Sequence, residues 1–182
     1  MELQLFNSLE KKITKIEIQA GQTITVYLCG PTVYDHIHVG NLRPVIIFDV
    51  LHRLLLHLNL KVNYVQNITD IDDKIIAKAQ QEKKSEKEIS NYYTQSYFAN
   101  LARYNILPPS YSPQVTNYIS QVQKFIKNLL EKGVAYQRFG EVFFEVEKNQ
   151  EYGKLSGQKL EKLKSGPETV IENKKSNKDF VL

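Results

Sequence analysis

The stretch TVYLCGPTVYDHIHVGNLRPVIIFDV, residues 25–50, gives the clearest indication of the fold of this chain. It opens inside TITVYLC, an alternating run of β-branched and aromatic residues that predicts a strand ending at Cys29. Gly30 and Pro31 stop that strand. Over residues 42–58 apolar side chains recur at helical spacing, which predicts a helix with a wide buried face. A strand, a polar loop and a buried helix therefore follow one another.

A second strand is predicted directly after this helix, over KVNYVQNI at residues 61–68. Thr69 or Asp70 can cap the helix that comes next. Asp72 and Asp73 fall in its first turn, where acidic side chains suit the helix dipole. Strand, helix, strand and helix in this order form a βαβ unit, from which parallel sheets are built. We therefore predict an α/β fold.

The stretch LPPSYSP, residues 107–113, interrupts this pattern and marks the best boundary in the chain. We place one region at residues 1–112 and a second at residues 113–182. In the second region QVTNYISQVQKFIKNLLEKG predicts an amphipathic helix closed by Gly133. VAYQRFGEVFFEV then predicts a hairpin that turns near Gly140, and the final KDFVL is typical of the start of a strand.

Composition limits the class of protein. A chain of 182 residues with 42% hydrophobic residues can build a globular core. It contains neither an apolar stretch near the ~20 residues of a membrane helix nor a signal-peptide pattern, so we expect no membrane and a cytoplasmic location. The net charge of +4 comes from lysines scattered among glutamates, and it does not predict nucleic-acid binding by itself.

The segment around His38 follows the first strand of the predicted parallel sheet. Ligands bind at that end of such sheets, beside helix N-termini with unpaired N–H groups. Gly40 lets a base or phosphate approach the backbone, while a histidine can donate a hydrogen bond as charge develops at phosphorus. Asn41 keeps an amide donor without charge. The alternative is a loop that carries two surface histidines, His36 and His38.

Two further features have structural alternatives. The single cysteine, Cys29, is either a small core residue at a strand end or a reduced thiol, a ligand that zinc prefers. TDIDDK, residues 69–74, lacks the Gly and Glu of an EF-hand loop, so capping accounts better for its aspartates. Four aromatic residues near helical spacing could stack on bases, but a core role is preferred: Tyr92, Tyr93, Tyr97 and Phe98.

Three segments together carry a resemblance to a known family: CGPTVYDHIHVGN, VIIFDVL and NITDIDDKII. In this order and at these separations they resemble the amino-terminal half of cysteinyl-tRNA synthetases, which are class I aminoacyl-tRNA synthetases. The similarity extends from LFNSL to DFVL. Residues 38–41, His-Val-Gly-Asn, fall where the class I signature His-Ile-Gly-His lies. Val39 is a conservative change, whereas Asn41 departs from the final histidine of the signature.

The resemblance implies a fold and a reaction. The fold is the first half of a Rossmann-like nucleotide-binding domain followed by an inserted α+β connective region. The reaction is ATP-dependent activation of cysteine to its adenylate, with ATP bound with Mg²⁺, and then transfer to tRNA(Cys). A related ligase that joins cysteine to a glucosaminyl inositol is one alternative. A non-catalytic remnant that binds a nucleotide or a partner is another.

The resemblance also implies roles for six residues. His38 and Asn41 act at the phosphates as catalytic residues, and Gly40 completes the ATP-binding set. Gly30 and Thr69 line the amino-acid pocket, and Cys29 is the first zinc ligand. The family's other zinc ligands and its Lys-Met-Ser-Lys-Ser loop are not found in this sequence. We therefore expect an amino-terminal part of a longer, monomeric protein that does not act alone.

Overall fold

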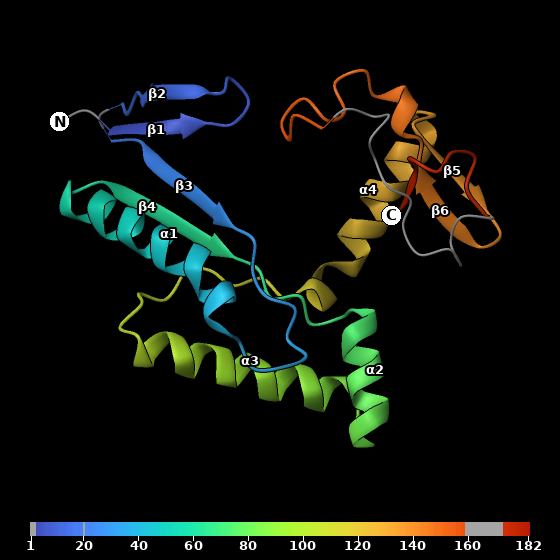
Figure 1. Cartoon of the computed structure of the whole chain (residues 1–182), viewed down its shortest axis with the longest axis horizontal. Coiled ribbons are helices and arrows are strands. Elements are labelled where there is room, and N and C mark those ends of the chain that lie inside the picture. Colours follow the sequence, from blue (N-terminus) through green and yellow to red (C-terminus); the bar gives the residue numbers. More distant parts are fainter. Residues whose placement is uncertain (1–2, 20, 159–172) are drawn as a thin grey trace. The chain divides into compact units, whose positions relative to one another are not determined.

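The computed structural model describes residues 3–19, 21–158 and 173–182, which form two compact units (Figure 1). One unit is Ile18–Ile119, and the other combines Met1–Glu17 with Ser120–Leu182. Part of the predicted region 113–182, residues 159–172, lies outside the described residues. Among the helices that the structure describes, none is both long enough and apolar enough to cross a membrane.

The unit Ile18–Ile119 is built on the predicted βαβ arrangement. Strand β3 (Thr23–Leu28) leads through a loop into helix α1 (Val39–His57), and strand β4 (Lys61–Gln66) returns beside β3. The two strands are parallel and in register from Thr23–Lys61 to Leu28–Gln66, with α1 running alongside them (Figure 1). Two helices complete the unit, α2 (Asp73–Glu82) and α3 (Glu86–Arg103). The predicted α/β fold is confirmed.

The start of α2 corrects the predicted cap. Asp72 is the N-cap, and its side chain accepts a hydrogen bond of 2.9 Å from the Lys74 N–H. Thr69 and Asp70 do not cap this helix, because the backbone at Thr69 still pairs with the segment after β3. The Asp70 carboxylate instead accepts the backbone N–H and the hydroxyl of Thr116. The acidic run therefore joins two segments as well as starting a helix.

The proline-rich stretch predicted as a boundary lies along β4. The carbonyl of Tyr111 accepts from the Gln66 N–H at 3.0 Å, and the carbonyl of Pro113 accepts from the Ile68 N–H at 2.8 Å. A proline can accept in this way because the pairing uses its carbonyl and not its missing N–H. The compact units divide between Ile119 and Ser120. The domain boundary at residue 112 stays a prediction.

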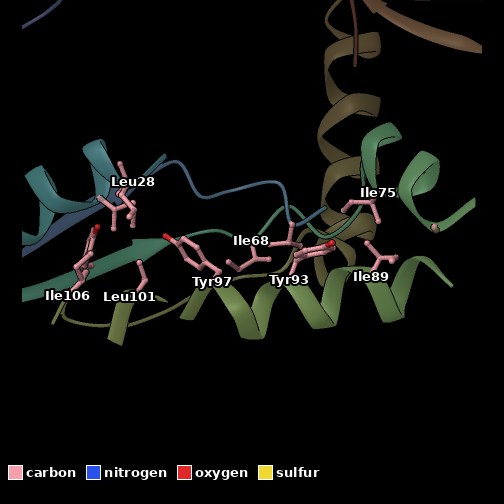
Figure 2. Close-up of a cluster of buried hydrophobic side chains, with 13 residues drawn as sticks. Leu28, Ile68, Ile75, Ile89, Tyr93, Tyr97, Leu101 and Ile106 are labelled. Atoms are coloured by element: carbon pink, nitrogen blue, oxygen red, sulfur yellow. The ribbon is translucent and has the colours of Figure 1, made fainter. Parts of the chain in front are cut away.

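The core of this unit combines side chains from β3, β4 and all three helices α1, α2 and α3 (Figure 2). Tyr93 and Tyr97 are buried in it, as predicted, and Phe98 packs against it. Tyr92 was predicted with them but is 58% exposed, and its ring packs edge-on against that of Tyr93 at 5.0 Å. The Tyr97 hydroxyl donates to Gln66 Oε1 at 2.9 Å, and burial raises the pKa of Tyr97 to about 12.

The other unit contains a hairpin, a helix and a small antiparallel sheet. Strands β1 (Leu3–Asn7) and β2 (Lys12–Ile16) form the hairpin. The predicted helix over 114–133 begins as a 3₁₀ turn, Val115–Tyr118, which still belongs to the unit Ile18–Ile119, and continues as α4 (Ile119–Glu131). The sheet consists of β5 (Ala135–Arg138), β6 (Glu141–Phe144) and β7 (Phe180–Val181). Phe139 and Gly140 turn the hairpin with positive φ angles of 53° and 82°, as predicted.

Candidate functional site

A polar pocket of about 250 Å³ opens in the loop between β3 and α1. Its walls come from this loop, from the first turn of α1 and from the first turn of α2. Seven polar or charged residues line it: Thr32, Tyr34, Asp35, His36, His38, Asn41 and Lys74. The structure therefore brings together His38 and Asn41, which were predicted as a pair, and adds a lysine from a segment more than 30 residues away.

His38 is the N-cap of α1, and its bonds determine where its ring proton lies. Its Nδ1 accepts a hydrogen bond of 3.0 Å from the Gly40 N–H. In return the Asn41 Oδ1 accepts from the His38 N–H at 3.2 Å, which completes a capping box. A neutral imidazole that accepts at Nδ1 carries its proton on Nε2. The cap thus leaves an Nε2–H donor on His38 and an NH₂ donor on Asn41.

Gly40 has no room for a side chain beside this ring. A Cβ atom at residue 40 would lie 2.8 Å from His38 Cε1 and 3.0 Å from His38 Nδ1. Any larger residue would push the imidazole out of its capping position, because such short contacts do not occur in real structures. The glycine of the His-Val-Gly-Asn motif therefore protects the orientation of the histidine.

The other wall of the pocket holds a second histidine and a cation. His36 Nδ1 lies 2.9 Å from the Ser96 hydroxyl, and its ring packs edge-on against Tyr93 at 5.2 Å. These contacts fix His36 to α3. The Lys74 ammonium lies 5.3 Å from the centre of the Tyr34 ring, a cation–π distance. Sequence reasoning missed Lys74 and Tyr34, since only the tertiary fold shows that they meet.

Gly30 and Thr69, the residues predicted to bind the amino acid, both lie just beyond the ends of β3 and β4, where Thr69 pairs with Thr32 and Gly30 lies against Asn67. The Thr69 N–H donates to the Pro31 carbonyl at 3.0 Å, so the parallel pairing continues past both strands. Asn67 connects the pair through its side chain. Its Oδ1 accepts from the Gly30 N–H at 2.8 Å, and its Nδ2 donates to Thr69 Oγ1 at 3.2 Å. Asn67 was not among the predicted site residues.

The close approach of these two chains requires glycine at residue 30. A Cβ atom there would lie 1.4 Å from the backbone oxygen of Asn67. Because that atom belongs to the backbone, no rotamer change can relieve the clash. Gly30 therefore allows the two strand ends to come together, which is a structural reason for a residue predicted from its position in a motif.

Cys29 follows β3 directly, as predicted, and its side chain is exposed. Its sulfur lies 3.9 Å from the Gly30 carbonyl oxygen, within reach of a weak S–H donor. Within the described residues, no group of three His, Cys, Asp or Glu side chains is placed to hold a metal ion. These residues alone do not fit a zinc site, which needs three or four protein ligands.

Comparison with known proteins decides the family. Residues 15–182 match the model described as "tRNA synthetases class I (C) catalytic domain". The chain belongs to this family. It is 43% identical over 183 residues to a cysteine–tRNA ligase of Brevibacillus brevis. This alignment covers 100% of this chain and 39% of that protein.

Other relatives agree. A cysteine–tRNA ligase of Mycoplasmoides gallisepticum is 46% identical over 99% of this chain and 41% of its own length. One from Archaeoglobus fulgidus is 41% identical over 99% of this chain and 39% of its own length. The chain therefore spans about two fifths of the length of these curated relatives.

The solved structures contain a more distant likeness. A protein described as an arginyl tRNA synthetase from Campylobacter jejuni aligns with a TM-score of 0.49 and 16% sequence identity. The alignment covers 74% of this chain and 40% of that one. A likeness at this level carries no argument about function.

Proposed function

We propose that this chain belongs to a cysteine–tRNA ligase. The complete reaction has two steps: cysteine and ATP form cysteinyl adenylate and pyrophosphate, and the cysteinyl group is then transferred to tRNA(Cys). Membership of the class I synthetase family and relatives at 41–47% identity that carry this name support the proposal. We also propose a cytoplasmic location, because the proposed role is in translation, and a monomeric state.

The orientation of the His38 ring is the observation that supports the proposed chemistry at the ATP phosphates. In the first step a carboxylate oxygen of cysteine attacks the α-phosphorus of ATP, and the bond to the bridging oxygen of pyrophosphate breaks. Negative charge on the phosphate oxygens must be stabilised while this happens. The Nε2–H of His38 and the NH₂ of Asn41 are donors that the capping box leaves unspent. We assign both to the ATP phosphates, with Gly40 beside the adenine or ribose.

No protein nucleophile is needed in this step. The substrate carboxylate is itself the nucleophile, so the protein contributes by holding it near phosphorus and by stabilising charge. Lys74 adds a positive charge to the same pocket, and Asp35 adds a carboxylate. Magnesium enters with ATP as part of that substrate.

Gly30 and Thr69 are proposed to bind the amino acid, because both lie beyond the same end of the parallel strands and both bond to the Asn67 side chain. Cys29 is proposed as one zinc ligand, next to Gly30. A bound zinc ion would take the substrate thiolate as a ligand and so select cysteine. Since the described residues supply no complete ligand group, the reaction step above is derived without it.

The test uses the full-length protein and the substitution His38→Asn. Asparagine is a strong N-cap, so the helix start is retained while the imidazole donor is lost. We expect kcat of cysteine-dependent ATP–pyrophosphate exchange to fall about 10²- to 10³-fold, the usual effect of removing one such donor. His57→Asn, an exposed histidine at the other end of α1, is the matched control and should leave kcat unchanged.

Two results would contradict the proposal. Wild-type kcat in His38→Asn would show that the imidazole does not act at the phosphates. Pyrophosphate exchange without charging of tRNA(Cys) would favour the alternative ligase that uses another acceptor for cysteine.

A further inference from the structure

The side chain of Asn67 occupies the junction between the ends of β3 and β4. It makes three hydrogen bonds there, with the Gly30 N–H at 2.8 Å, the Tyr27 hydroxyl at 3.1 Å and Thr69 Oγ1 at 3.2 Å. We propose that Asn67 is a positioning residue for the amino-acid substrate, acting through the Thr69 hydroxyl. The inference rests on the proposed role of Thr69 and adds the residue that directs it.

The orientation of the Asn67 amide follows from its partners. A backbone N–H can only donate, so the amide atom that faces Gly30 must be the oxygen. Tyr27 donates its hydroxyl proton to the same oxygen. The opposite atom, which faces Thr69, is therefore the NH₂ group. A flipped amide would place two N–H donors against each other at Gly30.

This orientation determines what Thr69 can offer. Its Oγ1 accepts a proton from Asn67, so its own O–H proton must point elsewhere. Among the described residues, no acceptor takes that proton. The Thr69 hydroxyl is partly buried, one of its lone pairs accepts from Asn67, and its proton is free to donate to a ligand. An amino-acid carboxylate is an acceptor of that kind.

Gly30 offers the complementary group. Its N–H is already bonded to Asn67, so the group left to meet a ligand is its carbonyl oxygen, which has only the weak S–H donor of Cys29 nearby. A carbonyl accepts from an ammonium group, and the Thr69 hydroxyl donates to a carboxylate. Through its two hydrogen bonds Asn67 leaves the Gly30 carbonyl as an acceptor and the Thr69 hydroxyl as a donor. This is the polarity that a zwitterionic amino acid requires.

The substitution Asn67→Asp tests the direction of the hydroxyl. One carboxylate oxygen can still accept from Gly30 and Tyr27, so the strand junction is retained. The second oxygen replaces the NH₂ and draws the Thr69 proton toward residue 67. In full-length protein we expect the KM for cysteine in pyrophosphate exchange to rise about 10- to 100-fold, as for a lost bond to a charged group. The KM for ATP should change less than about twofold.

Three matched variants complete the experiment. Asn63→Asp makes the same change at an exposed residue of β4 and should leave both KM values unchanged. Thr69→Val removes the hydroxyl and should raise the KM for cysteine as strongly as Asn67→Asp does. In the Thr69→Val background, Asn67→Asp should add less than about threefold, because the group through which it acts is gone.

The outcomes separate the two proposals. If Thr69→Val leaves the KM for cysteine unchanged, the assignment of Thr69 to the amino acid fails. If Thr69→Val raises it and Asn67→Asp does not, the role of Thr69 stands and the inference about Asn67 is overturned. The inference would also be overturned if the KM for cysteine in the double variant rose by the product of the two single fold-changes. A parallel rise in the KM for ATP would overturn it as well, since either result indicates a general structural role.

Discussion

Asn67 and Asp179, one in each compact unit, are hydrogen-bond hubs, meaning that each side chain bonds to three other groups. The partners of the two hubs differ in how many of their donors and acceptors remain free. Asp179 is 2% exposed, and its carboxylate accepts from the Tyr136 hydroxyl, the Val146 N–H and the Ser176 N–H at 2.7, 3.0 and 3.2 Å. Each of those donors is used up by the bond. The Asp179 hub therefore holds the C-terminal strand in place and presents nothing to solvent.

The Asn67 hub has partners that keep an unspent group. Thr69 accepts from Asn67 and retains its proton, and Gly30 donates to Asn67 while its carbonyl has only the weak S–H donor of Cys29 nearby. By contrast, Tyr136 donates to Asp179 and accepts the Lys175 N–H at 2.7 Å, so its hydroxyl is satisfied in both directions. A hub whose partners have all their hydrogen-bonding groups satisfied stabilises the fold. A hub whose partners keep a free donor or acceptor indicates a binding site for a ligand.

Gly30→Ala should give the largest effect, because it separates the two strand ends that the Asn67 hub joins. The added Cβ would overlap the Asn67 backbone oxygen at 1.4 Å, so the backbone must move. We expect the free energy of unfolding to fall by about 3 kcal/mol or more, measured by urea denaturation.

Gly21→Ala is the control for this prediction. Gly21 has a φ of 80° and open space around it, so alanine meets only backbone strain, worth about 1 kcal/mol. Equal losses in the two variants would show that the close approach at Gly30 does not matter for stability.

Asp179→Asn tests the saturated hub and should rank second. Asparagine keeps one accepting oxygen and replaces the other by NH₂, so at least one of the buried donors loses its acceptor. We expect a loss of about 2 kcal/mol in the free energy of unfolding, measured by denaturant titration. A change below about 0.5 kcal/mol would mean that the Asp179 hub is not structural.

Asn67→Asp is the reciprocal change and should affect stability least. The Gly30 and Tyr27 donors keep their acceptor, and the Thr69 hydroxyl can reverse and donate. We expect the free energy of unfolding to change by less than about 1 kcal/mol in the same titration. A loss as large as that of Asp179→Asn would erase the distinction between the two hubs and make Asn67 a structural residue.

The sequence predicts the elements of the fold better than the contacts at the site. Periodicity alone placed the strands β3 and β4 and the helix α1 within about three residues, because strand and helix patterns are local. The cap of α1 was missed, since histidine is an uncommon N-cap and the expected helix began at Leu42. The wrong cap of α2 has a similar cause: Asp70 and Asp72 are equally good caps by type, and only pairing at Thr69 decides between them.

Side-chain bridges between distant segments lie beyond what a single sequence can predict. Asn67 meets Gly30 because of the register of β3 on β4, and a shift of one residue would point it to the other face of the sheet. Lys74 meets Tyr34 for the same kind of reason. The contacts among His38, Gly40 and Asn41 are local to one continuous motif, so the sequence alone could group these residues, and their functional roles stay predictions.

The central claim is that the cap of α1 fixes the ring proton of His38 on Nε2 and aims it at the phosphates of ATP. NMR of full-length protein labelled with ¹⁵N-histidine tests it directly, at about pH 8, where an ordinary imidazole is neutral. His38→Asn identifies the signal. The account predicts that Nε2 carries the proton, that Nδ1 shows the shift of an unprotonated, hydrogen-bonded nitrogen, and that the Nε2 signal moves when MgATP is added. A proton on Nδ1, or an Nε2 signal that saturating MgATP leaves in place, would contradict it.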